Sequence, residues 1–203
     1  MPTNGLMSMI ELDRRAVRAS LDAFATWQPG SDDPGTPCAG WQLGDLVAHM
    51  TIQQQGFARA VAGERTERAD WAPTRHNDPV GVYRSACDQV VTAFAGLSDP
   101  TTPVLLPEVG PDPLPLSTAV GFHLVDNVVH AWDVARSLGA RPSLDDDVVE
   151  AARTVARDVP DGERRDRPGA AFAHRLPLPD GVSALDETLQ LLGRDPRWHP
   201  AHA

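Results

Sequence analysis

The order of apolar and polar positions along the chain predicts four long helices. In the second of these segments the apolar side chains follow the i, i+3, i+4, i+7 spacing of one buried helix face, at Leu43, Leu46, Val47 and Met50. Similar periodicity recurs in three other segments, and the predicted helices span residues 9–27, 42–63, 80–97 and 116–138. Four amphipathic helices favour an all-α fold built as a four-helix bundle.

The remaining segments are interrupted by proline and glycine. Six prolines between residues 98 and 117 exclude a helix there and predict a short hairpin or extended excursion before the fourth helix. Gly139 is a natural terminator of that helix. Two shorter helices are predicted at residues 144–158 and 183–192. We expect one domain over residues 1–203, with the bundle at 9–139 and a helical extension at 140–203 packed on it.

Charge and composition restrict the possible partners. The chain of 203 residues has 28 acidic and 18 basic residues, and its net charge of −10 would repel nucleic acid and an anionic membrane surface. Neither a secretion signal nor an apolar run of membrane-spanning length is visible, so a cytoplasmic monomer or homodimer acting on small molecules is expected. The two cysteines, Cys38 and Cys87, are read as reduced thiols. All basic residues are arginine, which indicates a high-GC, actinobacterial source.

The candidate chemistry lies on the fourth predicted helix. Asp126 and His130 are four positions apart, so they share a helix face at an axial separation of about 6 Å. A carboxylate and an imidazole at this spacing can bind one divalent metal ion. The alternative is an ordinary Asp–His ion pair on a solvated face. The apolar neighbours of the two residues leave little solvated face there.

A third ligand is expected from another helix. His49 is the best candidate, because it borders the apolar stripe of the second helix. A His49, Asp126 and His130 set would leave coordination positions open, as in catalytic metal sites, and such an ion can lower the pKa of a bound thiol. Zinc is the first choice, although this ligand set also accepts nickel, iron or manganese.

Three further residues are candidates for the surroundings of this ion. His123 shares the face of His130 at an axial distance of about 10 Å, which suggests a second layer around the metal or the lining of a substrate pocket. Asp45 is a possible ligand or pocket residue, or else an acid that stabilises the N-terminus of the second helix. Asp133 could orient an imidazole as an acceptor, or instead pair with Arg136 or with an arginine of the first helix.

Three sequence blocks resemble a known family. They are Thr36-Pro37-Cys38-Ala39-Gly40-Trp41 continuing to Asp45-Leu46-Val47-Ala48-His49, then Val128-Val129-His130-Ala131-Trp132-Asp133-Val134-Ala135-Arg136, and Leu192-Gly193-Arg194-Asp195-Pro196. The chain is similar to actinobacterial metal-binding proteins related to the N-terminal domain of mycothiol-dependent maleylpyruvate isomerase, within the DinB-like superfamily. This resemblance implies a four-helix bundle that holds zinc or nickel by a histidine of the second helix and an acid-xxx-His pair, at the positions of His49, Asp126 and His130.

The resemblance also shapes the expected function. The isomerase itself carries glutamate at the position of Asp126 and has a separate C-terminal domain, so maleylpyruvate is not the expected substrate. The resemblance implies a metal-dependent transferase or isomerase that uses a low-molecular-weight thiol, mycothiol, on an electrophilic small molecule. The alternative is a non-catalytic metal- or ligand-binding protein with the same bundle. A non-haem iron oxygenase has the right ligand types but usually a β-barrel fold.

Overall fold

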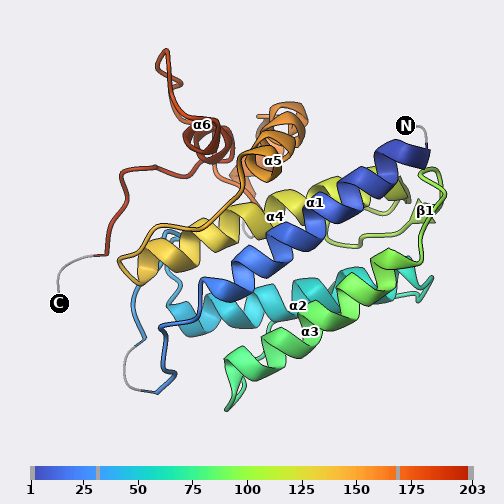
Figure 1. Ribbon diagram of the computed structural model, residues 1–203, viewed down its shortest axis with the longest axis horizontal. Helices are drawn as coiled ribbons and strands as arrows, with labels where there is room; N and C mark the ends of the chain where they lie inside the picture. Colours follow the sequence, from blue (N-terminus) through green and yellow to red (C-terminus); the bar gives the residue numbers. More distant parts are fainter. Residues whose placement is uncertain (1–2, 31–32, 168–169, 201–203) are drawn as a thin grey trace.

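The computed structural model describes residues 3–30, 33–167 and 170–200 (Figure 1). Its helices are α1 (Thr3–Asp22), α2 (Leu43–Val61), α3 (Pro79–Ala95), α4 (Leu116–Ser137), α5 (Asp146–Asp158) and α6 (Ala184–Leu191), with 3-10 turns η1 (Arg68–Trp71) and η2 (Glu163–Asp166). Two short strands, β1 (Pro103–Val104) and β2 (Leu114–Pro115), pair antiparallel directly before α4. The predicted all-α class is confirmed, and the excursion before α4 is a hairpin.

Helices α1 to α4 form the bundle. In Figure 1, α1 crosses α4 on one side of the molecule and α2 runs beside α3 on the other. The predicted span of the first helix, residues 9–27, is wrong at both ends, because α1 covers Thr3–Asp22. Leu6 is fully buried and therefore extends the apolar face toward the N-terminus. Beyond Asp22 the chain leaves the helix in a turn that still buries Phe24.

Local signals set several of the other boundaries. The Asp78 carboxylate accepts a hydrogen bond from the Gly81 amide and caps α3, whose first residue is Pro79. The Ser183 hydroxyl accepts from the Asp186 amide at the start of α6. Helix α4 ends before Gly139, which adopts a φ of 70° in the left-handed region that favours glycine.

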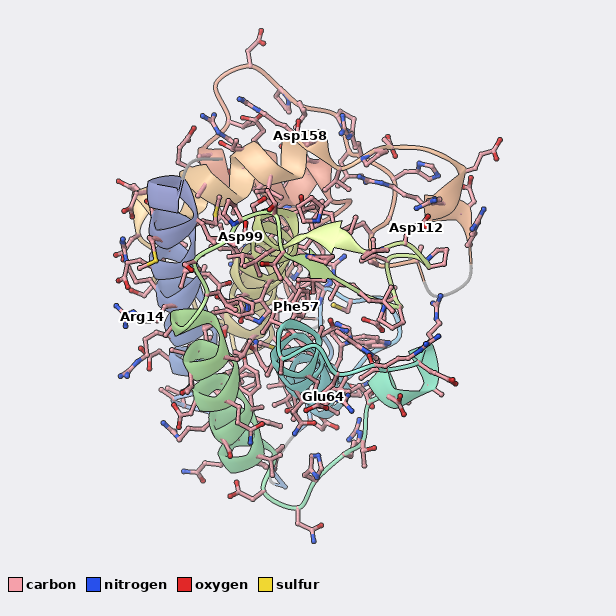
Figure 2. All side chains as sticks on the ribbon, turned by 90° about the vertical axis from the view of Figure 1, so that its right-hand side faces the viewer. Arg14, Phe57, Glu64, Asp99, Asp112 and Asp158 are labelled. Carbon is pink, nitrogen blue, oxygen red and sulfur yellow. The ribbon has the colours of Figure 1, made fainter. Side chains whose placement is uncertain are left out.

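Helix α4 is the centre of the protein. Its sides are covered by α1, α2 and α5, and most of its residues are buried, including Trp132, which packs in the core as expected. Figure 2 shows Phe57 of α2 in the middle of the molecule and the charged side chain of Arg14 at its edge. A polar side chain on α4 therefore lies in a largely apolar environment unless it faces a gap between helices.

The C-terminal helices pack on the bundle through α4. Val148 and Ala152 of α5 and Leu189 of α6 belong to one buried cluster with residues of α4. Arg15 of α1 bonds Asp145 and Asp147 at the start of α5, which ties the extension to a second helix of the bundle. No described helix has the length and apolar character needed to cross a membrane.

Candidate metal centre

His130 and Asp126 face each other across one turn of α4. The His130 Nε2 atom lies 3.3 Å from Asp126 Oδ1, with 8% and 23% of the two side chains exposed. The pair is therefore mostly buried, but Asp126 keeps partial contact with solvent. The structure does not place it on the solvated face that an ordinary surface ion pair would occupy.

His49 of α2 completes the group. Its ring meets that of His130 at 81°, with 5.3 Å between the ring centroids. One potential ligand atom from each of His49, Asp126 and His130 lies within 4.8 Å of the other two. The ring of Trp41 lies 5.0 Å from that of His49 at an interplanar angle of 59°. The structure thus brings His49 of α2 to the Asp126–His130 pair of α4, which lies far from it in the sequence.

The separation of these donor atoms fits a single ion. Two ligand atoms bound to a tetrahedral zinc ion at about 2.1 Å are about 3.4 Å apart, and His130 Nε2 and Asp126 Oδ1 are 3.3 Å apart. Two imidazoles and a carboxylate are also the donor types that zinc and neighbouring transition metals accept. A set of three protein ligands leaves at least one coordination position for another molecule.

The pKa values of the three side chains are shifted in different directions by their surroundings. Burial, together with the neighbouring His130, lowers the pKa of His49 to about 4, so its imidazole is neutral at pH 7. Burial would raise the pKa of Asp126, but the adjacent His130 outweighs it and holds the value at about 2. Although burial opposes the change, the Asp126 and Asp133 carboxylates raise the pKa of His130 well above its ordinary value. Without a metal ion, the His130 ring is therefore protonated on both nitrogens, as the imidazolium cation, at neutral pH.

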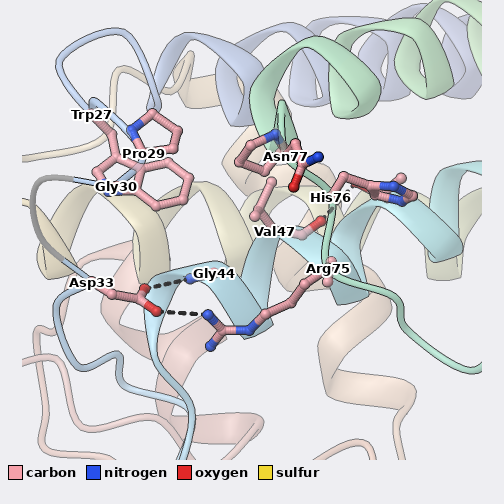
Figure 3. Close-up of a pocket in the computed structure, with 12 residues that line it drawn as sticks. Trp27, Pro29, Gly30, Asp33, Gly44, Val47, Arg75, His76 and Asn77 are labelled. Carbon is pink, nitrogen blue, oxygen red and sulfur yellow. Dashed lines mark hydrogen bonds and ion pairs between the residues drawn. The ribbon is translucent and has the colours of Figure 1, made fainter.

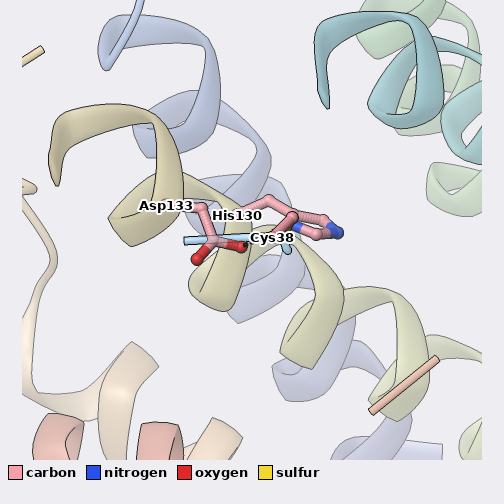
Figure 4. A group of neighbouring side chains, drawn as sticks. All are labelled: Cys38, His130 and Asp133. Atoms are coloured by element: carbon pink, nitrogen blue, oxygen red, sulfur yellow. Dashed lines mark hydrogen bonds and ion pairs between the residues drawn. The ribbon is translucent and has the colours of Figure 1, made fainter. Parts of the chain in front are cut away.

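The other nitrogen of His130 faces a second group of polar side chains. His130 Nδ1 lies 2.9 Å from Asp133 Oδ2, and the Cys38 thiol donates to the same oxygen at 3.3 Å (Figure 4). The Arg194 guanidinium, from the segment after α6, contacts Asp133 Oδ1 at 3.2 Å and the Cys38 sulfur at 3.2 Å. Asp133 thus pairs with Arg194 and not with Arg136, which donates to the Trp198 carbonyl.

Cys38, His130 and Asp133 also have donor atoms close enough to hold a metal ion. Arg194 argues against that use, because its guanidinium already occupies both the carboxylate and the sulfur. A second cation there would meet the positive charge of Arg194 at contact distance. The Nε2 side of His130 is therefore the better candidate position for a cation, and the contacts on the Nδ1 side support the ring.

His123 is placed in the bundle core. Its ring is fully buried, with Nδ1 2.7 Å from Asp13 and Nε2 2.8 Å from Gln54, and neighbouring bonds extend to Asn127 and Tyr83. This network joins α1, α2, α3 and α4. Both ring nitrogens of His123 have partners in the core, so its contacts do not support the expected position in a pocket or beside the metal ligands.

Asp45 also lies apart from the ligand group. Its carboxylate accepts from the Gln42 amide at the start of α2 and bonds Arg75 at 2.8 Å. These contacts match the alternative interpretation, an acid at the helix N-terminus, and give no support to a ligand or pocket role. Arg75 in turn borders a cavity of about 600 Å³ on another face of α2, where Asp33 holds its guanidinium (Figure 3).

Comparison with known proteins places this geometry in a family. Residues 14–135 match the family described as mycothiol maleylpyruvate isomerase N-terminal domain. The chain belongs to this family. Two uncharacterized proteins of Mycobacterium tuberculosis, MT0763 of strain CDC 1551 and Rv0738 of strain H37Rv, are 28% identical over 188 residues, which is 90% of this chain and 97% of each relative. No solved structure matches the chain.

The residues that match the family include the three candidate ligands but not Arg194, which contacts Asp133 beside them. His49, Asp126 and His130 all lie within the matched residues 14–135, whereas Arg194 lies beyond them. Sequence reasoning did not place Cys38, Trp41 or Arg194 at the centre. A signal was nevertheless present, because each of the three belongs to a sequence block that carried the family resemblance, and the blocks meet around His130.

Proposed function

We propose that the protein binds one divalent metal ion through His49, Asp126 and His130 and uses it in the chemistry of a low-molecular-weight thiol. The observation that carries the proposal is the convergence of three donor atoms within 4.8 Å on two helices, at a partly accessible position. Membership of a family named for a mycothiol-dependent isomerase supports the choice of thiol. The reaction class is transfer of the thiol to an electrophilic small molecule, or thiol-assisted isomerisation.

The chain's own residues have distinct tasks in this proposal. A bound ion with an open coordination position would supply Lewis acidity that lowers the pKa of an incoming thiol. His49, neutral at pH 7, offers a lone pair without first losing a proton. Asp126 contributes negative charge, and His130 must release the proton it holds before Nε2 can bind a cation. Trp41 packs its ring against that of His49.

Cobalt substitution tests the proposal directly. Metal-free protein is loaded with one equivalent of Co²⁺, and mycothiol is added while the visible absorption spectrum is recorded. A thiol that enters the open position changes the ligand-field bands, and an added electrophile should then give an S-conjugate or isomer faster than metal-free protein does. His49→Ala is the matched control. A spectrum that does not respond to thiol, with the metal tightly held, would favour a non-catalytic binding protein instead.

A further inference from the structure

Arg194 reaches the candidate metal centre from outside the bundle. It follows α6 in the chain, yet its guanidinium bonds Asp133 of α4 and Cys38 of the segment before α2. Only 12% of the Arg194 side chain and none of the Asp133 side chain is exposed. A buried carboxylate with a buried arginine as its partner holds a defined orientation, because neither group can turn toward water without losing the pair.

This orientation reaches the metal ligand through one hydrogen bond. Asp133 Oδ2 is 2.9 Å from His130 Nδ1, while His130 Nε2 points toward Asp126 on the other side of the ring. A hydrogen bond at one imidazole nitrogen fixes the ring and leaves the other nitrogen to bind the metal. The carboxylate that holds His130 is itself held by Arg194 Nε, which contacts both of its oxygens, at 3.2 and 3.4 Å.

Charge distribution gives Arg194 a second effect. His130 lies between two carboxylates, Asp126 and Asp133, and either could in principle attract a cation. The positive charge of Arg194 lies against Asp133 and leaves Asp126 without an arginine partner among the contacts in the described chain. A cation is therefore directed to the Asp126 side, where His49 supplies the third donor atom.

We propose that Arg194 is a positioning residue of the metal centre, so that the C-terminal extension is part of the site and not only a cover for the bundle. Arg194 acts through Asp133, which it fixes against His130 Nδ1. The inference rests on the proposed metal site but not on its thiol chemistry. It assigns a role to a residue outside the segment that matches the family.

Removal of the side chain should weaken metal binding. We expect Arg194→Ala to lower the affinity for Zn²⁺ and Co²⁺ by about 10-fold or more, within the range of about 10 to 100-fold seen for residues that orient metal ligands. The Co²⁺ absorption spectrum should change as well, because His130 is no longer held in one orientation. Arg194→Lys keeps the positive charge without the forked geometry, so it should give an intermediate loss and remain folded if the alanine variant does not.

The chain offers a matched control for loosening of the tail. Arg136 donates to the Trp198 carbonyl from α4, so it also anchors the C-terminal segment, but among the described residues it forms no hydrogen bond or ion pair with Asp133 or His130. Arg136→Ala should leave the metal affinity within about twofold and the Co²⁺ spectrum unchanged. An equal loss of affinity in Arg136→Ala and Arg194→Ala would overturn the proposal, since general packing of the tail would then explain both.

A double-mutant cycle tests the route through Asp133. If Arg194 acts only through that carboxylate, Arg194→Ala should have little further effect on affinity in an Asp133→Asn background. Full additivity of the two losses, or wild-type affinity in Arg194→Ala, would overturn the proposal. NMR of the metal-free protein gives a readout that needs no ion. The hydrogen-bonded Nδ1 proton of His130 should be visible in wild type and Arg136→Ala and lost in Arg194→Ala.

These outcomes separate the positioning role from the proposed function. Wild-type protein that binds metal but does not respond to thiol contradicts the thiol chemistry and leaves the role of Arg194 open to support by affinity and spectrum. Wild-type protein that binds no metal contradicts the metal site. In that case the NMR comparison still decides, because an unchanged Nδ1 signal in Arg194→Ala would show that the arginine does not position the ring.

Discussion

The rings of His49 and His130 meet edge to face, although the two residues belong to different helices, and their centroids are 5.3 Å apart. This contact couples α2 to α4 at the point where Asp126 also offers an oxygen. Two imidazoles beside one carboxylate gain little from apolar packing, and burial disfavours a positive charge on either ring. A shared cation is the partner that would use all three groups at once.

Replacement of His49 should abolish tight metal binding. We expect His49→Ala to reduce the affinity for Zn²⁺ by more than about 100-fold, beyond the range typical of residues that only orient ligands. The affinity can be measured by competition with a chromophoric chelator. His76→Ala is the control, because His76 borders the separate cavity on another face of α2. Equal affinity of the two variants would exclude His49 as a ligand.

Metal binding at pH 7 should release close to one proton. The two neighbouring carboxylates raise the pKa of His130 against the effect of burial, so the metal-free ring is protonated, whereas the low pKa of His49 leaves its ring neutral. A cation on His130 Nε2 must displace the proton there. Affinity should therefore increase with pH until the raised pKa of His130 is passed.

Calorimetry in buffers with different ionisation enthalpies counts the released protons. Asp126→Asn removes the carboxylate closest to His130 Nε2 and should reduce the number released, because the ring then loses its proton more easily before the metal arrives. Binding that is independent of pH between 6 and 8 would contradict the assigned protonation of His130.

Most helices were predictable because their apolar faces repeat over several turns. Helices α2 to α6 begin and end within two residues of the predicted bounds. The first helix was placed too late, although Leu6 lies one turn before Ile10 on the same apolar face, because Thr3, Asn4 and Gly5 around its start are weak helix formers. Local periodicity shows which face of a helix is apolar, but how far along the helix that face is covered depends on the tertiary fold.

In the candidate site, too, contacts within one helix were predictable and contacts made by the tertiary fold were not. Asp126, His130 and Asp133 share one helix, so their proximity follows from the helical repeat. Arg194 contacts Asp133 across 61 positions, and only the return of the chain after α6 creates that contact. His123 shows the converse problem. It shares a helix face with His130 in the sequence, yet its partner Asp13 comes from α1, and spacing alone could not separate a core histidine from a pocket histidine.

The buried pair of Asp13 and His123 should stabilise the fold without affecting the metal site. Asp13→Ala leaves a fully buried imidazole nitrogen without its hydrogen-bond partner and should lower the free energy of unfolding by about 1 to 3 kcal/mol, measured with urea. Zn²⁺ affinity of the folded protein should change by less than about threefold. Glu11→Ala, on the exposed face of the same helix, is the control and should cost under about 1 kcal/mol. A large loss of affinity in Asp13→Ala would place His123 in the metal centre after all.

The ion pair of Asp126 and His130 should stabilise the metal-free protein most at intermediate pH. The difference in free energy of unfolding between wild type and Asp126→Asn, plotted against pH, should therefore be bell-shaped. The pKa of Asp126 is lowered to about 2, so its contribution is present above the ordinary aspartate value and is lost as pH falls toward 2. The pKa of His130 is raised, so the same contribution is complete below the ordinary histidine value and is lost as pH rises through the raised one. Near pH 5 both conditions hold, and wild type should exceed Asp126→Asn by about 2 kcal/mol in the free energy of unfolding.

Urea unfolding at a series of pH values measures this difference. Asp22→Asn provides the comparison, because Asp22 pairs with Arg18 on the surface and such pairs contribute at most about 1 kcal/mol. The difference for Asp126→Asn should narrow at both ends of the pH range, while that for Asp22→Asn stays small throughout. Greater stability of Asp126→Asn at pH 5 would show that desolvation of the carboxylate outweighs its attraction to His130. The carboxylate would then be held in the bundle at a cost to the fold, as expected for a group retained to bind an ion.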